Sequence, residues 1–410
     1  MWAVSASGRL GLAVYDELHY QTGNLVFSPH GLWTAMALLY PGTGGGTRER
    51  LGQFLDIESV DNAISLGREL KTRTGVPSGY RNLHKEPQSS DLTPSSEVKK
   101  SPSKRSAKAI RVVPTGRTSY DFSTRLDVAN AMWFQRGYPV KGSYLRAVKE
   151  AFETKPEPID LADREGTASL VNKWVREATN GRVDRVIEPA SIDPKMRAIL
   201  ANAVYFKSRW LNTFHEEETK PEPFHVSAES TVLAPMMRQH CVAPLARDGD
   251  LLAVELPYVC EDLVMDVLLP DAILATGAPP IATPQRVSRL LSTLKETSID
   301  LRMPRFCVKC RAPLLEPLAK VGLGDLFSSG LPDFSGVSDE PGFAIGDIVQ
   351  STLVDVSELG TEAASGSAIY YAGGRSSSTV EVVMDRPFYF VIRDKPTDTF
   401  LFFGRILDPP

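Results

Sequence analysis

Two cysteines three residues apart, Cys307 and Cys310, are the first candidates for chemistry, because a CxxC pair can hold a metal ion or cycle as a disulfide. The surrounding segment LRMPRFCVKC alternates in the manner of a β-strand. Residues three apart on a strand point to opposite faces, so the two thiols cannot bind one metal ion together. No second CxxC and no histidine pair completes a site. We therefore expect structural thiols, with neither a metal nor another cofactor.

The histidine and serine motifs of enzymes are the next candidates. The sequence contains no GxSxG elbow and no HExxH helix, and His215, which begins the run HEEET, lacks the second histidine of a zinc site. We expect the carboxylates of that run to form a solvated face. The other histidines follow no ligand spacing and are His19, His30, His84, His225 and His240. The chain is therefore predicted not to be an enzyme.

The most unusual stretch lies near the C-terminal end, over residues 358–379. Small residues follow one another over 360–368, and the whole stretch is too polar for a core helix and too long for a tight turn. Loops longer than about 12–15 residues are usually functional or disordered. Two glycines precede Arg375, so the Arg375–Ser376 bond has the flexibility and the side chain that a trypsin-like protease requires. A loose linker is the alternative interpretation.

The same stretch can also be read as a β-strand, on which side chains alternate between two faces. One face would carry Thr361, Ala363, Ser365, Ser367, Ile369 and Tyr371. The other would carry Glu362, Ala364, Gly366, Ala368 and Tyr370. Over the first half, nothing large or charged lies on the first face, so this half suits insertion into a crowded sheet. The segment is thus predicted to serve both as exposed bait and as an inserted strand.

The overall composition is that of a globular protein with a sizeable core: the chain has 410 residues, of which 42% are hydrophobic and 23% charged. The net charge of −4 gives no general attraction to nucleic acid or membrane surfaces, and no apolar run approaches the roughly 20 residues of a membrane span. The N-terminal segment predicts an amphipathic helix rather than a secretory signal, and no Asn-x-Ser/Thr acceptor occurs. We expect a cytoplasmic location, with an extracellular one left open.

Local signals predict helices and turns in the first part of the chain. Ser28 is suited to cap a helix whose first turn contains Pro29, and an apolar run from Leu32 to Leu39 follows. The glycine-rich turn after this run lacks the lysine and the spacing of a phosphate-binding loop. We expect the turn to end at Thr47, as the cap of the next helix.

The second part of the chain predicts strands interrupted by helices. A strand-like run spans Leu126 to Phe134, and helical periodicity spans Thr167 to Thr179 before the terminating pair Asn180-Gly181. Farther on, strand patterns such as LLAVELPY, LVMDVLLP and FYFVIRD dominate, with helices expected at Arg286 to Thr297 and Leu314 to Val321. Helices in front and strands behind indicate a mixed α+β fold.

Residues 71–117 differ in composition from the rest, because Ser, Pro, Lys and Arg dominate there and large apolar residues are scarce. Such a segment buries too little surface to offset its ordering entropy, so we expect a disordered insertion. Its basic side chains could bind a polyanion, such as a heparin-like chain, or act as a nuclear address; a solvated flexible loop is the alternative. The basic residues are Lys99, Lys100, Lys104, Arg105, Lys108 and Arg111.

A series of short blocks, in order along nearly the whole chain apart from the basic insertion, resembles the serpin family. No single block is decisive, but so many in the right order are highly specific. The segment Gly360-Thr361-Glu362-Ala363-Ala364 resembles the loop hinge of that family. The other blocks are residues 24–29, 130–131, 172–175, 179–182, 202–207, 210, 236–237, 255–258, 268–270, 304–306, 386–388 and 403–406.

The resemblance implies a single serpin domain over residues 1–410, with about nine helices, three β-sheets and an exposed reactive loop at 358–380. It also implies a mechanism, in which a target protease attacks a bait bond, forms an acyl-enzyme and is carried to the far pole as the loop enters the main sheet. The chain is then expected to be a monomeric inhibitor of serine endopeptidases. It would act as a suicide substrate, and its partner would be a trypsin-like protease held as a covalent acyl complex.

The resemblance further implies which residues act in the loop. Counting strictly from the hinge puts the bait bond after Gly374, but glycine offers a protease pocket almost nothing, so we favour Arg375–Ser376. Some serpins do not inhibit and act as carriers, chaperones or storage proteins; they commonly lose the small-residue hinge, which is intact here. The hinge residues are Glu358, Gly360, Thr361, Glu362, Ala363, Ala364, Ser365 and Gly366.

Overall fold

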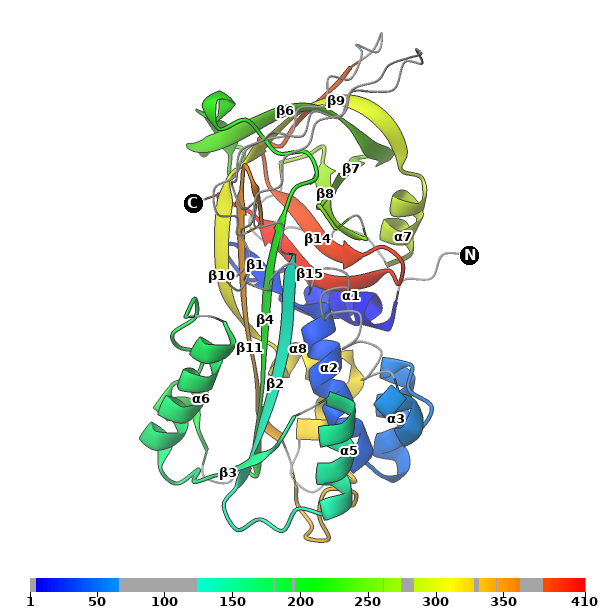
Figure 1. Ribbon diagram of the computed structural model, residues 1–410, viewed down its shortest axis with the longest axis vertical. Coiled ribbons are helices and arrows are strands. Elements are labelled where there is room, and N and C mark those ends of the chain that lie inside the picture. The colour runs from blue at the N-terminus through cyan, green and yellow to red at the C-terminus, as the bar shows by residue number, and fades with distance from the viewer. Residues whose placement is uncertain are drawn as a thin grey trace, which may run out of the picture.

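The computed structural model describes residues 5–65, 124–152, 154–179, 181–193, 196–260, 262–273, 284–327, 332–343, 345–361 and 379–409. The molecule is elongated, with most helices at one end and an arch formed by two long strands, β6 and β9, at the other (Figure 1). None of the helices in these ranges is long and apolar enough to cross a membrane.

A six-stranded sheet runs along the length of the molecule in the order β10-β11-β12-β4-β2-β3. Neighbouring strands are antiparallel except for the pairs β11–β4 and β2–β3, which are parallel. The strands are β2 (Arg125–Gln135), β3 (Glu157–Ile159), β4 (Ala198–Arg209), β10 (Phe306–Pro313), β11 (Ile345–Ser357) and β12 (Gly360–Thr361).

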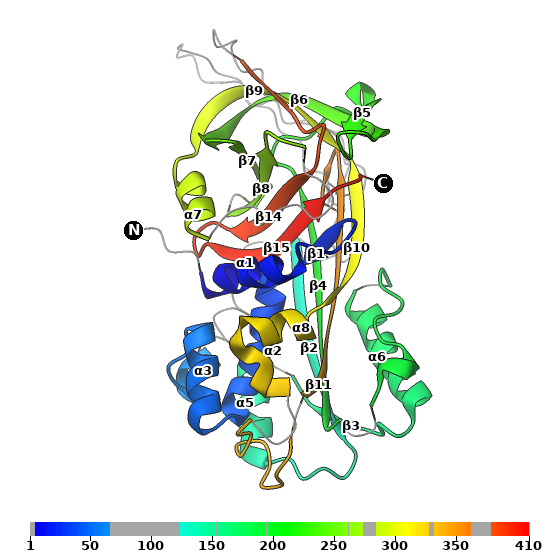
Figure 2. The same ribbon diagram turned by 180° about the vertical axis from the view of Figure 1, so that it is seen from behind.

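Both faces of this sheet are covered, which explains why its central strand β4 is buried along nearly its whole length. On one face, Leu200 packs with helix α2 (Pro29–Leu39) in the main core. On the other, Ile199 packs with helix α6 (Arg164–Ala178) in a separate cluster. The two views from opposite sides show α2 and α6 on either side of the sheet (Figures 1 and 2).

The remaining strands form a nine-stranded sheet in the order β1-β15-β14-β8-β7-β6-β9-β13, with β5 paired to β6. Strand β6 is 18 residues long and belongs to two parts of this sheet, since it pairs with β7 near one end and with β9 and β5 over the rest. The described strands therefore form two hydrogen-bonded sheets where three were expected, because β6 joins the part with β5 and β9 to the part with β7. The strands of the nine-stranded sheet are β1 (Leu25–Phe27), β5 (Lys220–His225), β6 (Thr231–Asp248), β7 (Leu251–Pro257), β8 (Leu263–Pro270), β9 (Lys295–Pro304), β13 (Val380–Val383), β14 (Phe388–Asp394) and β15 (Thr399–Ile406).

The remaining described helices are α1 (Ala6–Leu18), α3 (Gly45–Leu55), α5 (Gly142–Phe152), α7 (Pro284–Ser292) and α8 (Leu315–Leu318). Helix α2 begins as predicted, because Ser28 Oγ accepts a hydrogen bond from Gly31 N and Pro29 occupies the first turn. Helix α6 ends where expected, at a turn in which Gly181 has a φ of +79°.

Two local predictions were wrong. Helix α3 begins at Gly45 with Gly44 as its cap, so Thr47 lies inside the helix, where its hydroxyl accepts a hydrogen bond from Asp333 N instead. The helix expected over Arg286 to Thr297 ends at Ser292, because the residues from Lys295 onward pair with β6. In both cases a partner distant in sequence decided the local structure.

The strand interpretation of the CxxC segment is confirmed. Cys307 and Cys310 lie on β10, where Cys307 is exposed and Cys310 packs against the core. The two thiols therefore face opposite sides of the sheet. Within the described ranges, no group of three or more His, Cys, Asp or Glu side chains could hold a metal ion.

Candidate functional site

The candidate site is a seam in the six-stranded sheet, between β11 and β4. These parallel strands pair directly from Ile345 opposite Ala198 up to Thr352 opposite Val204. Beyond that point the two-residue strand β12 lies between them, antiparallel to both. The segment that the sequence predicts to insert therefore follows directly after β12, at the end of the seam where β11 and β4 are apart. Over the rest of the seam the two strands pair with each other.

Thr361, the last described residue before that segment, has its side chain inside the molecule. It is opposite Ser208 of β4 and Val356 of β11, and it is fully buried. Its hydroxyl is 2.7 Å from the hydroxyl of Tyr258, whose ring stacks on Trp210 with a centroid distance of 4.5 Å. The inward face at the head of the seam is therefore closely packed around a small polar side chain.

Gly360 can only be glycine in this arrangement. Its φ is +151°, and a Cβ atom there would lie 2.2 Å from the Ser208 carbonyl oxygen and 2.6 Å from Arg209 Cα. The missing side chain lets the hinge backbone approach β4 closely enough to pair with it.

Glu358 fixes the turn that leads into β12. Its buried carboxylate accepts hydrogen bonds from the Arg305 guanidinium and, at 2.8 Å, from the Thr219 hydroxyl. Although burial opposes ionisation, these donors and the backbone hold the pKa of Glu358 below its ordinary value. The carbonyl oxygens of Glu358 and Leu359 also accept hydrogen bonds from Phe214 N and Trp210 N. The start of the predicted hinge is therefore anchored to the head of β4.

A family model described as serpin (serine protease inhibitor) matches residues 5–409. The chain belongs to the serpin family. An uncharacterised serpin-like protein of Thermococcus kodakarensis is 30% identical, over 99% of this chain and 85% of its own length. The leukocyte elastase inhibitor of Bos taurus is 29% identical, over 95% of this chain and 94% of its own.

Solved serpin structures have the same fold as this chain. Serpin48 of the insect Tenebrio molitor superposes with a TM-score of 0.78 at 23% identity, covering 99% of this chain and 97% of its own. Native protease nexin-1, solved with heparin, gives a TM-score of 0.76 at 23% identity, covering 99% and 98%. The predicted family and the predicted α+β serpin fold are both confirmed.

Lower in the seam of this serpin, a buried polar network joins the two strands. Gln350 Nε2 on β11 donates to Asn202 Oδ1 on β4 at 2.9 Å and to the Ser28 carbonyl oxygen at 3.0 Å. Gln350 Oε1 accepts from Ser28 N, and Asn202 Nδ2 donates to Asn130 Oδ1 on β2. The side-chain bond between Gln350 and Asn202 closes the seam from within.

Sequence reasoning missed this network and the Glu358–Arg305 pair. A signal was present, because Asn202 and Gln350 each directly follow apolar residues in a strand pattern and a buried amide needs partners. The partners themselves lie 148 residues apart, so the sequence did not show that the two amides meet. The remaining predicted loop and polyanion-binding residues lie outside the described ranges and are Glu362, Ala363, Ala364, Ser365, Gly366, Gly374, Arg375, Ser376, Lys99, Lys100, Lys104, Arg105, Lys108 and Arg111.

Proposed function

We propose that this serpin inhibits a trypsin-like serine protease as a suicide substrate. The observation that carries the proposal is β12, which already lies between β11 and β4 and directly precedes the small-residue segment. The relatives include proteins named as inhibitors, such as the bovine leukocyte elastase inhibitor. A carrier, chaperone or storage role does not require the segment after β12 to insert.

The proposed chemistry belongs to the protease. Its catalytic serine attacks the carbonyl carbon of Arg375, the peptide bond to Ser376 breaks, and the amine of Ser376 leaves while the arginine stays bound as an ester. Cleavage frees the chain that follows Thr361 to extend β12 down the seam, since each strand added to a sheet gains main-chain hydrogen bonds. The protease is carried along before water can hydrolyse the ester.

The register at the head of the seam predicts where each inserted residue would lie. Counting six residues on from Thr361 leads to Ser367, and six residues back from its partners Ser208 and Val356 lead to Asn202 and Gln350. After insertion, Ser367 would therefore lie between Asn202 and Gln350, whose side chains bond directly to each other in the native form. A small hydroxyl at this position matches the polar groups on both sides.

Cleavage of the loop is expected to raise the stability of the protein. The chain would be cut within residues 362–378 by a protease that is not trapped, and thermal unfolding of the native and cleaved forms would be followed by circular dichroism. Insertion adds a strand to the sheet, so the cleaved form should unfold at a clearly higher temperature. An unchanged unfolding temperature would instead favour a non-inhibitory serpin.

The same experiment on a Ser367→Ala variant tests the proposed register. An inserted strand separates its neighbours by about 9–10 Å, so Asn202 and Gln350 could not reach each other and their buried amides would lose a partner. The cleaved variant should lose about 1–3 kcal/mol in guanidinium unfolding, while the native form stays unchanged. Ser376→Ala, beyond the inserting half, is the matched control.

We also propose that the basic insertion binds a polyanion, because six Lys or Arg residues lie within residues 99–111. Heparin is the probe, and protease nexin-1, a structural neighbour, was solved with it. Replacing all six residues with alanine should lower the salt concentration at which the protein elutes from a heparin column. Elution at the same salt concentration would mean that the insertion is only a solvated loop.

A further inference from the structure

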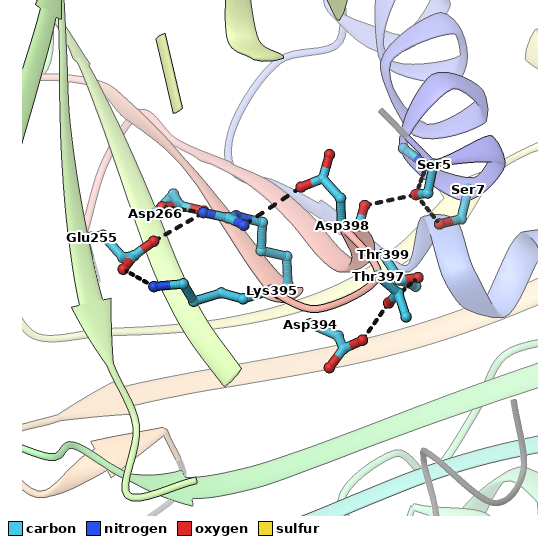
Figure 3. Close-up of polar contacts among 11 residues, drawn as sticks. Ser5, Ser7, Glu255, Asp266, Asp394, Lys395, Thr397, Asp398 and Thr399 are labelled. Atoms are coloured by element: carbon cyan, nitrogen blue, oxygen red, sulfur yellow. Dashed lines mark hydrogen bonds and ion pairs between the residues drawn. The ribbon is translucent and has the colours of Figure 1, made fainter. Parts of the chain in front are cut away.

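A buried cluster of charged side chains lies in the nine-stranded sheet, away from the seam. Arg393, near the end of β14, contacts Asp266 on β8, Glu255 on β7 and Asp398 in the turn between β14 and β15. Lys395, in the same turn, contacts Glu255 at 2.7 Å. Figure 3 shows Glu255 and Asp266 on one side of the cluster and Asp398 on the other, with dashed lines marking the contacts.

The cluster contains one more carboxylate than cations. Three carboxylates share the Arg393 guanidinium, and Lys395, which is 43% exposed, is the second cation. Burying an ionised group without a cation of its own is costly. Asp398 has the weakest contact, at 3.5 Å from Arg393, although it is largely buried. One proton would bring the cluster to neutrality.

Among the residues that the structure describes around the cluster, the contacts of the turn add no further cation. Asp394 faces the hydroxyl of Thr397, and Asp262 accepts a hydrogen bond from the Lys395 backbone through its carbonyl oxygen. On the side of α1, the Ser5 hydroxyl donates to the carbonyl oxygen of Asp398 and lies 3.1 Å from the Ser7 hydroxyl. The charged residues around the turn are therefore Glu255, Asp262, Asp266, Arg393, Asp394, Lys395 and Asp398.

We propose that this cluster takes up a proton on mild acidification and thereby holds the β14–β15 turn more firmly against β7 and β8. The turn joins two neighbouring strands of the sheet and also contacts the start of α1 through Ser5. Its tightening would make native protein more resistant to unfolding in a mildly acidic medium. The inference concerns the scaffold and does not depend on protease inhibition.

The electrostatics of the two aspartates agree with this direction. Burial raises the pKa of Asp266 and of Asp398 to about 6, in spite of the opposing charge of Arg393. The ordinary value is 3.8, so between about pH 4 and 6 the native chain holds a proton that the unfolded chain has lost. This contribution to stability is complete below the ordinary pKa and disappears as the pH rises through 6.

The test compares unfolding at pH 7.5 and pH 5.0 in wild-type protein and in Asp398→Asn. Asp398 has a φ of +53°, which asparagine tolerates as well as aspartate does, so the variant should keep the turn while removing the titrating group. From pH 7.5 to 5.0, the wild-type unfolding equilibrium constant should fall about tenfold more than that of the variant. Asp271→Asn, a surface carboxylate paired with Arg247, should behave as wild type.

Asp266→Asn and infrared spectroscopy keep the proposal falsifiable. Loss of the pH effect in either aspartate variant supports it and shows which carboxyl holds the proton. Asp266→Asn could fail to fold, so infrared spectroscopy gives an independent measurement. A protonated-carboxyl band should grow in native wild-type protein as the pH is lowered from 7.5 to 5.0. Absence of this band from Asp398→Asn would confirm the proposal. Full retention of the pH effect in every folded aspartate variant, with no such band in wild type, would overturn the proposal.

Discussion

A Thr361→Arg variant should still be cleaved by the target protease but should no longer trap it. Thr361 is fully buried between β11 and β4, against the Tyr258 hydroxyl. An arginine there must either bury an unpaired guanidinium, which costs several kcal/mol, or keep the hinge out of the seam. Both outcomes slow insertion, while the Arg375–Ser376 bond and its neighbouring sequence are unchanged. The ester would then be hydrolysed before the protease is displaced.

The measurement is the number of serpin molecules consumed for each protease molecule inactivated. Every 1.4 kcal/mol added to the insertion barrier favours hydrolysis tenfold, so this number should rise by at least about tenfold. Thr379→Arg, the same change at an exposed position on the other side of the loop, controls for charge alone. Thr361→Ser keeps the hydroxyl and should trap normally. Undiminished trapping by Thr361→Arg would show that Thr361 does not lie on the inserting face.

An Arg375→Ala variant should lose most of its inhibition of trypsin-like proteases. Such proteases recognise arginine through a charged pocket, and removing one partner of a buried charge pair costs about 2–5 kcal/mol. The rate of forming the detergent-resistant covalent complex should therefore fall by at least about 30-fold. Arg375→Lys keeps the charge and should retain most of the activity.

Mass spectrometry of the released C-terminal peptide identifies the cleaved bond directly. A peptide that begins at Ser376 supports the proposed bait bond, and one that begins at Arg375 supports the strict count from the hinge. If Arg375→Ala forms the complex as fast as wild type and the peptide is unchanged, the arginine assignment is wrong. Testing an elastase-like protease in parallel separates a wrong target class from a protein that does not inhibit.

Local residue patterns were sufficient to predict several elements of the fold. The Ser28-Pro29 cap, the apolar runs of β7, β8 and β14 and the terminating glycine at Gly181 all act over a few neighbouring residues. Each of these signals depends only on residues within its own segment. The ordered series of family blocks then identified the serpin fold, although no block alone did so.

Long-range pairing decided the rest. Thr47 bonds to Asp333 rather than capping its own helix, and Lys295 joins a strand because β6 lies beside it.

By itself, the sequence determined the fold family and a segment whose side chains are small enough for insertion, because these depend on residue type and order. Only the tertiary structure decided that β12 occupies the head of the seam, that Gln350 meets Asn202 below it, and that Arg393 gathers three carboxylates. These contacts join residues from different strands, often more than a hundred positions apart. Their geometry follows from sheet register, which residue spacing along the chain does not encode.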